Sequence, residues 1–163
     1  LEKMVNELTL RKQREERAGR PFSPSALVIG TTKQKDLSVF VHPIVELISE
    51  MGNPMVVVTQ PSEGRLPPVE CDDLADEIRL QYPEARIQVR PNLHVALNTA
   101  VEEAVDSAAH SFIDGVSGSV WCFGSVHLIG GLLTILGRDT DEALSTMKWK
   151  EDDVIGDRDT MKP

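Results

Sequence analysis

Four short runs rich in apolar residues recur along the chain, at residues 26–30, 55–59, 85–89 and 120–123. The first two runs lack any alternation of apolar and polar side chains, which is typical of strands that are covered on both faces. A segment with helical spacing follows each run, so the pattern predicts repeated βα units. Right-handed crossovers between parallel strands place helices on both faces of a sheet, and we therefore expect a three-layer α/β sandwich with a mostly parallel sheet.

The spacing of apolar residues also predicts where the first two helices lie. The first is expected to end near Arg17, and its apolar stripe consists of Leu1, Met4, Val5 and Leu8. Asp36 can cap the second helix, and Pro43 is expected to bend it. The predicted inward face of this second helix consists of Leu37, Phe40, Val41, Ile44, Val45, Ile48 and Met51.

Three further helices follow the remaining strands. Asp72 or Asp73 can cap the third helix, whose inward residues are predicted to be Leu74, Ala75 and Ile78. Asn92 can cap the fourth. The predicted face of this fourth helix consists of Leu97, Val101, Ala104, Val105, Ala108 and Phe112. The apolar, glycine-containing segment 126–136 is expected to be a fifth helix.

Length and composition predict one domain followed by a tail. The chain has 163 residues, of which 40% are hydrophobic and 26% charged, the composition of an ordinary globular protein. We expect an α/β domain over residues 1–137 and a charged, flexible tail over residues 138–163, because the tail has few large apolar side chains. No apolar run approaches the roughly 20 residues of a membrane span, so no membrane insertion is expected.

The net charge of −9 opposes attraction to nucleic acid or to anionic membranes, so neither is expected as a partner. Cys71 and Cys122 are the only cysteines and form no C-x-x-C pair, so the sequence predicts neither a disulfide framework nor a zinc site. A reducing compartment fits this usage best. No residue is assigned as catalytic or as a metal ligand.

Ligands of open α/β sheets bind outside the carboxyl ends of the strands, and one turn there has the pattern of an anion site. At residues 122–131 (CFGSVHLIGG) a strand runs through Gly124 and Ser125 into a helix. The hydroxyl of Ser125 and the free amides of the first helical turn suit a carboxylate or phosphate, and His127 could add a contact. The alternative is that Ser125 merely caps its helix and that Gly130 and Gly131 allow close helix packing.

A second candidate is the loop that follows the first strand. Thr31, Thr32, Lys35 and Asp36 place hydroxyl, ammonium and carboxylate groups at the same edge, where Lys35 could contact a phosphate or carboxylate. The alternative is a solvated loop in which Asp36 caps the next helix. None of the turns matches G-x-x-x-x-G-K-[ST] or G-x-G-x-x-G, so no self-contained nucleotide site is predicted.

The remaining histidines and the Gly-Ser pair give weaker predictions. His42 and His110 lie within predicted helices and are expected to be surface or packing residues, whereas His94 opens a helix at the ligand edge without a visible partner. The chain has no G-x-S-x-G elbow, which disfavours a serine hydrolase.

Three motifs in this order resemble the C-terminal domain of the folylpolyglutamate synthase and dihydrofolate synthase family, within the Mur ligase superfamily. They are residues 28–30 (VIG) with 35–37 (KDL), residues 57–61 (VVTQP) before an acidic helix, and residues 123–131 (FGSVHLIGG). The last motif is the most specific, and the resemblance covers residues 1–136. It implies a Rossmann-like fold of the Mur ligase C-terminal type.

The resemblance also implies an ATP-dependent amide ligase, in which the carboxylate of a folate or dihydropteroate is phosphorylated and L-glutamate attacks the acyl phosphate. In that family the Gly-Ser-x-[Tyr/His] turn lies beside the incoming glutamate, which would be held by Ser125 and His127. The loop with Thr31, Thr32, Lys35 and Asp36 would lie toward the nucleotide phosphates. ATP and Mg²⁺ would be bound mainly by an N-terminal ATPase domain, the partner on which this domain closes.

The family's P-loop and its Asp-Gly-Ala-His-Asn motif would precede Leu1, so we expect the chain to be the C-terminal portion of such a ligase and inactive alone. The alternative is a stand-alone Rossmann-like binding or interaction module without catalysis. The sequence leaves open whether the ligase acts as dihydrofolate synthase, as folylpolyglutamate synthase or as both. We expect a cytoplasmic protein, with a mitochondrial location as the alternative.

Overall fold

Four parallel strands form one sheet in the computed structural model, which describes residues 2–19, 22, 24–33, 36–61, 66–109 and 118–138. The strands are β1 (Ala26–Gly30), β2 (Met55–Val58), β3 (Ile87–Val89) and β4 (Val120–Gly124). They lie in the order β3-β2-β1-β4, and every pairing is parallel. The four predicted strands and their parallel arrangement are confirmed, although β2 and β3 are shorter than the apolar runs in the sequence.

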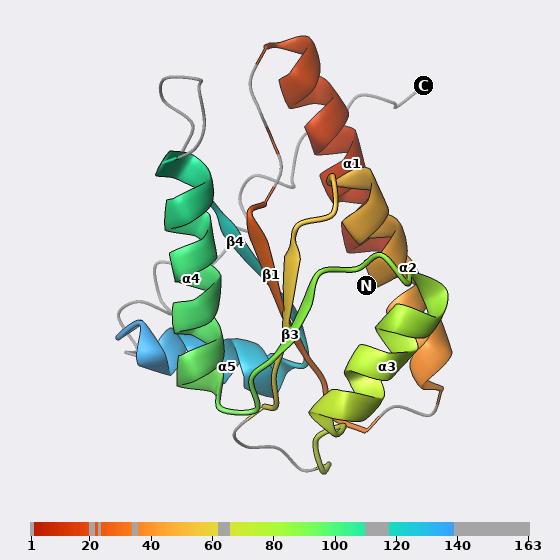
Figure 1. The fold of residues 1–163 in the computed structure, drawn as a ribbon, viewed down its shortest axis with the longest axis vertical. Coiled ribbons are helices and arrows are strands. Elements are labelled where there is room, and N and C mark those ends of the chain that lie inside the picture. The colour runs from red at the N-terminus through yellow and green to blue at the C-terminus, as the bar shows by residue number, and fades with distance from the viewer. Residues whose placement is uncertain are drawn as a thin grey trace, which may run out of the picture.

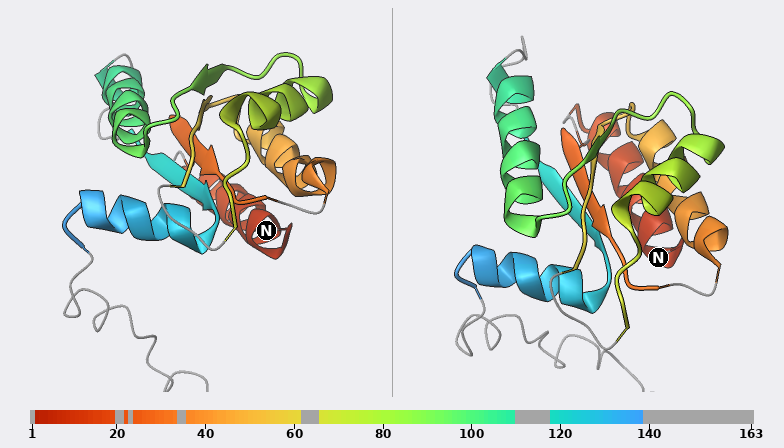
Figure 2. Two further views of the ribbon diagram at one scale, coloured as in Figure 1. Left: turned by 90° about the horizontal axis from the view of Figure 1, so that it is seen from below. Right: turned by 60° about the horizontal axis from the view of Figure 1, so that its bottom comes forward.

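Five helices surround this sheet in the described part of the chain: α1 (Glu2–Arg17), α2 (Leu37–Glu50), α3 (Cys71–Gln81), α4 (Leu93–Ala109) and α5 (Val126–Ile135). Figures 1 and 2 show α1, α2 and α3 on one face of the sheet, and α4 on the opposite face with α5 beside it. The predicted three-layer α/β sandwich is therefore confirmed. None of the described helices combines the length and apolarity needed to cross a membrane.

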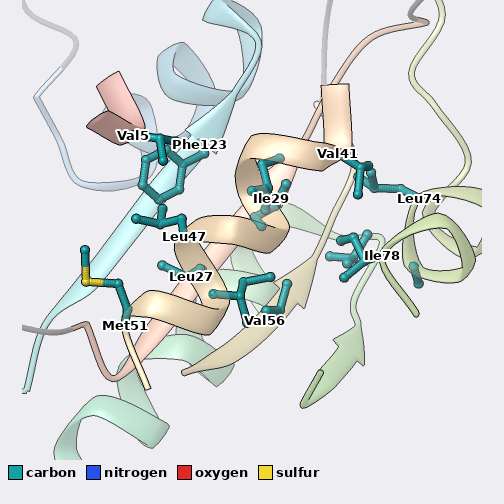
Figure 3. Packing of buried hydrophobic residues seen from close by; sticks show 14 of the residues in the cluster. Val5, Leu27, Ile29, Val41, Leu47, Met51, Val56, Leu74, Ile78 and Phe123 are labelled. Atoms are coloured by element: carbon teal, nitrogen blue, oxygen red, sulfur yellow. The ribbon is translucent and has the colours of Figure 1, made fainter. Parts of the chain in front are cut away.

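The side chains of β1 alternate between two cores. Leu27 and Ile29 pack among α1, α2 and α3 in the larger cluster (Figure 3), whereas Ala26 and Val28 face the alanines of α4. All four side chains are fully buried, as expected for a central parallel strand. A third cluster joins α4 to α5 and consists of Leu93, Leu97, Leu128 and Leu132.

Side-chain caps define the starts of two helices as the sequence predicts. The Asp36 carboxylate accepts hydrogen bonds from the backbone N–H groups of Ser38 and Val39 at the start of α2. The Asn92 side-chain oxygen accepts from the N–H of Val95 at 3.1 Å, at the start of α4. The α2 helix continues through Pro43, and the bend expected there stays a prediction.

The predicted cap of α3 is wrong. The cap residue is Glu70, two or three positions earlier than Asp72 and Asp73, and it makes no side-chain cap hydrogen bond. The two aspartates lie instead within the first turn, where negative charge interacts favourably with the helix dipole. The same dipole preference enriches acids at the cap and in the first turn, so the sequence could not separate these positions. The predicted inward residues of α3, Leu74, Ala75 and Ile78, are fully buried.

The predicted face of α4 is also wrong in part. Val101 and Val105 are 46% and 61% exposed, and the buried residues are Leu93, Ala96, Leu97, Ala100 and Ala104. Small side chains let this helix lie close to β1 and β2, and this orientation turns the valines outward. Phe112, His110 and the predicted tail beyond Arg138 lie outside the described residues.

Candidate functional site

The carboxyl ends of β1 and β4 meet at two glycines. Gly30 and Gly124 are paired in register, and a Cβ atom added at Gly124 would lie 1.7 Å from the Gly30 carbonyl oxygen. Gly124 also has a φ of 146°, which L side chains rarely adopt. A Cβ atom at Gly30 would lie 2.4 Å from the carbonyl oxygen of Thr59, at the end of β2. Glycine therefore allows three strand ends to approach closely, which fixes the turn that follows β4.

Ser125 links this strand edge to α5. Its backbone N–H donates to the Gly30 carbonyl oxygen at 3.2 Å, and its hydroxyl oxygen accepts from the N–H of Leu128 at 3.3 Å. Ser125 is thus the N-cap of α5, which is the simpler of the two alternatives drawn from the sequence. The hydroxyl keeps a proton that it can donate, and the residue is only partly buried, so capping is compatible with ligand contact. Its role in glutamate binding stays a prediction.

A cleft of about 580 Å³ lies between the first turn of α4 and the length of α5. His127 lines it from α5, and Asn92 and His94 line it from the turn that follows β3. Thr31, Thr32 and Ser125 are not among its lining residues. The cleft therefore brings together the third and fourth βα turns, while Ser125 lies beside it, one residue before the lining residue Val126.

The cleft has an electrostatic character that differs from the whole chain. The protein carries 26 acidic residues, yet no carboxylate is among the described residues that line this cleft. Neither α4 nor α5 has an acidic residue in its first turn, whereas the first turn of α3 contains Asp72 and Asp73. The partial positive charge of the two helix starts is thus not offset locally, which suits an anionic ligand.

The loop after β1 is held by the segment that precedes α3. The Thr31 carbonyl oxygen accepts from the N–H of Val69 at 2.9 Å, and the N–H of Lys33 donates to Pro67 at 2.8 Å. Thr32 forms an isolated bridge with Pro68. Thr31 is only 1% exposed, so little of its side chain is accessible in this structure.

The same loop also contains Lys35 and Asp36, of which the structure describes Asp36. Asp36 is the cap of α2, and hydrogen bonds from the Ser38 hydroxyl and the Val39 N–H hold the pKa of its carboxyl below the ordinary value. This matches the capping alternative. Lys35 lies outside the described residues. A contact of Thr31, Thr32, Lys35 or Asp36 with nucleotide phosphates stays a prediction.

Sequence reasoning did not include Asn92 and His94 in the site. Nδ1 of the His94 ring lies 3.3 Å from Nδ2 of Asn98, the residue one helical turn later, so the i,i+4 spacing could have revealed this partner. The explanation of Gly130 by close helix packing is wrong, because a Cβ atom added there would meet no atom within 4 Å. Gly130 instead lines the cleft.

The described residues contain no group of three or more His, Cys, Asp or Glu side chains that could hold a metal ion. Cys71 and Cys122 are both free thiols. Burial raises the pKa of each to about 11, assisted at Cys71 by the neighbouring charges of Asp72 and Glu70. Neither thiol lines the cleft, so the site as described offers imidazole, amide and hydroxyl groups.

No family model matches the chain, and no curated protein matches its sequence. Two solved structures resemble its fold, both of folylpolyglutamate synthase from Mycobacterium tuberculosis. The structure complexed with ADP matches with a TM-score of 0.59 at 23% identity, and the one described as complexed with ADP and AMPPCP with a TM-score of 0.56 at 22% identity. The chain has the fold of part of a folylpolyglutamate synthase. Each match covers 83% of this chain but only 28% of the solved one, so the chain spans little more than a quarter of that length.

Proposed function

We propose that this chain is the C-terminal, glutamate-positioning part of an ATP-dependent folate:L-glutamate ligase of the folylpolyglutamate synthase and dihydrofolate synthase type. The observation that carries the proposal is the structural match to folylpolyglutamate synthase over 83% of the chain. The sequence motif at residues 123–131 supports it independently, because it lies at the carboxyl edge of the sheet, where such folds bind ligands.

The described residues do not fit a complete site for ATP and Mg²⁺. They include no cluster of metal ligands, and in the loop after β1 the Thr31 carbonyl and the Lys33 N–H are already hydrogen-bonded to Val69 and Pro67. The solved relatives carry ADP or AMPPCP by their names, which supports ATP as a co-substrate of the whole enzyme. We therefore assign nucleotide and metal binding mainly to an N-terminal ATPase domain.

The contribution of this chain is to hold and orient the amino acid. Ser125 and His127 would contact carboxylate groups of L-glutamate, so that its amine faces the activated carboxyl group of a folate or dihydropteroate. Fixing two reactants in one geometry replaces a bimolecular encounter and can supply several kcal/mol of the barrier reduction. No proton transfer is assigned to a residue of this chain.

A chimaera tests the proposal. This chain would replace the matched segment of the M. tuberculosis enzyme, and incorporation of labelled L-glutamate into folate and into dihydropteroate would be measured. We expect ATP-dependent incorporation, and we expect Ser125→Ala to raise the KM for glutamate roughly tenfold or more while changing that for ATP less. A folded chimaera without incorporation would contradict the ligase role, and an unchanged glutamate KM would remove Ser125 from the site.

The second candidate is a stand-alone binding module without catalysis. The lack of metal-ligand clusters among the described residues is as compatible with this candidate as with a ligase part. It predicts ligand binding by the chain but no transfer in the chimaera. For either candidate we propose a cytoplasmic location, with the mitochondrion as the alternative, which imaging of a tagged chain in its native cell would decide.

A further inference from the structure

Two histidines from different βα turns line one cleft. His94 belongs to the first turn of α4 and His127 to the first turn of α5, and both side chains are exposed to the cleft between these helices. The motif that relates the chain to a ligase includes His127 but not His94. An imidazole from each wall gives the cleft two groups that can donate a hydrogen bond or carry positive charge.

Gly130 gives a second and independent observation. Glycine destabilises a helix interior relative to alanine, so a helical glycine needs a reason. Gly130 lies in the middle of α5, its φ is not among the positive values of the described residues, and an added Cβ atom would meet nothing within 4 Å. Neither backbone conformation nor internal packing therefore requires glycine. Because the residue lines the cleft, the space it leaves open is available to a ligand.

The length of the cleft bears on what it accepts. Its lining on α5 extends from Val126 to Ile135, a span of about 14 Å along the helix axis at 1.5 Å per residue. Its volume of about 580 Å³ is within the range of small-molecule sites. With no lining carboxylate, it can take a ligand that carries more than one negative charge.

We infer that the cleft between α4 and α5 binds glutamyl carboxylates, with His94 as a second imidazole contact and Gly130 as the open floor. The inference rests on the proposed function and assigns His94, Asn92 and Gly130 to its amino-acid side. Glutamyl carboxylates have two sources in such a reaction: free L-glutamate and the γ-linked glutamyl chain of an acceptor that is already extended. The cleft length admits either.

Titrations of the isotope-labelled chain, followed by NMR, test the inference without any ligase activity. The probes are L-glutamate, γ-linked triglutamate and inorganic phosphate, and the resonances are the rings of His94 and His127. We expect both rings to shift with at least one glutamyl probe, and His94→Gln to weaken that binding at least fivefold. His42→Gln is the matched control, because His42 is exposed on α2 beside Glu46, and it is expected to leave binding unchanged.

The variant Gly130→Leu distinguishes loss of binding caused by a filled cleft from loss of binding caused by lower stability. Leucine restores helix propensity, so we expect an unchanged or higher Tm together with loss of glutamyl binding, since its side chain fills the cleft. Binding that survives this variant, or that is insensitive to His94→Gln, would overturn the inference. Equal binding of phosphate would also overturn it, because the cleft would then select charge alone.

Comparison of L-glutamate with γ-linked triglutamate shows whether the cleft takes the free amino acid or the glutamyl chain of an extended acceptor. Binding of either probe supports the site. This outcome is separable from the chimaera experiment. Glutamyl binding at His94 with no transfer by a folded chimaera would retain the cleft and remove the ligase role. Transfer that is indifferent to His94→Gln would retain the ligase and remove the cleft assignment.

Discussion

At the residue scale, Gly124 and Gly30 set the geometry on which the candidate site depends. Gly124→Ala places a Cβ atom against the Gly30 carbonyl oxygen and forces an L side chain to a φ of 146°. We expect a loss of more than about 2 kcal/mol of unfolding free energy, from strain and overpacking together. The measurement is the denaturant midpoint with its slope.

Gly52→Ala is the matched control for this prediction. Gly52 has a φ of 81°, but a Cβ atom added there would meet nothing within 4 Å. This variant therefore bears backbone strain without a clash, and we expect a loss of about 1 kcal/mol. If both variants lose the same amount of unfolding free energy, the strand ends can move apart to accept a Cβ atom. The close approach of the two strand ends would then not be the reason for glycine at position 124.

The thiols provide a pH-dependent prediction at the same scale. The pKa of Cys71 and of Cys122 is raised from 9.0 to about 11 because burial favours the neutral thiol. Two pKa units lower the thiolate fraction at pH 8 about a hundredfold. We expect both cysteines to react with iodoacetamide about a hundredfold more slowly in the native chain than in denaturant at pH 8, with a native rate that increases until the pH approaches 11.

The raised pKa of the two thiols also determines how the stability of the chain changes with pH. Below pH 8 the thiols are protonated in both the folded and the unfolded chain, so their contribution does not change with pH. Above pH 9 the unfolded chain releases these protons more readily than the folded chain, and stability decreases as pH increases toward 11. Native labelling at pH 8 as fast as in denaturant would contradict the burial of Cys71 and the partial burial of Cys122.

At the scale of elements, α4 shows where a periodic pattern misleads. The sequence places Val101 and Val105 inward because larger apolar residues are expected to be buried. The structure confirms Leu97 and Ala104 as buried but buries Ala96 and Ala100 in place of the two valines, since only a small side chain fits between this part of the helix and β1 or β2. Helix existence and extent are local properties that the sequence carries, whereas the rotation of a helix depends on how closely the sheet allows it to approach.

Two substitutions in α4 test this rotation. Ala100 is fully buried in the cluster with Val28 and Val57, so Ala100→Leu should overpack the interface and reduce stability by about 1–3 kcal/mol. Val105 is 61% exposed, so Val105→Lys should change stability by less than about 0.5 kcal/mol. Thermal unfolding of both variants gives the comparison, and a larger loss from Val105→Lys would restore the orientation predicted from sequence.

At the scale of the whole molecule, the sequence predicts the sheet better than the site. Four apolar runs and their order were sufficient to predict a parallel three-layer fold, because strands that are buried on both faces consist of nearly continuous apolar residues. The turn at Gly124 and Ser125 could be located from its motif. The placement of His94 and His127 along one cleft could not be located, because it depends on how α4 and α5 pack against each other, which no local pattern in either helix encodes.

The last prediction concerns what this chain can do without a partner domain. We expect the purified chain, supplied with ATP, Mg²⁺, folate and labelled L-glutamate, to form no folate-linked glutamate. The described residues offer no metal-ligand cluster, and the loop after β1 is hydrogen-bonded to residues 67–69. The chain also corresponds to only 28% of the solved folylpolyglutamate synthase. Carboxylate activation needs charge stabilisation at the transferred phosphoryl group, which these residues do not provide.

On the proposed function, the cleft between α4 and α5 would hold a glutamyl group, but its described lining includes no lysine or arginine that could hold an acyl phosphate against it. A ligand bound in half a site stays largely solvated, where its contacts are weak. An overnight incubation followed by separation of folate species measures the outcome, with the chimaera as the positive control. Folate-dependent incorporation by the chain alone would require a nucleotide site within its 163 residues and would overturn the assignment of ATP to another domain.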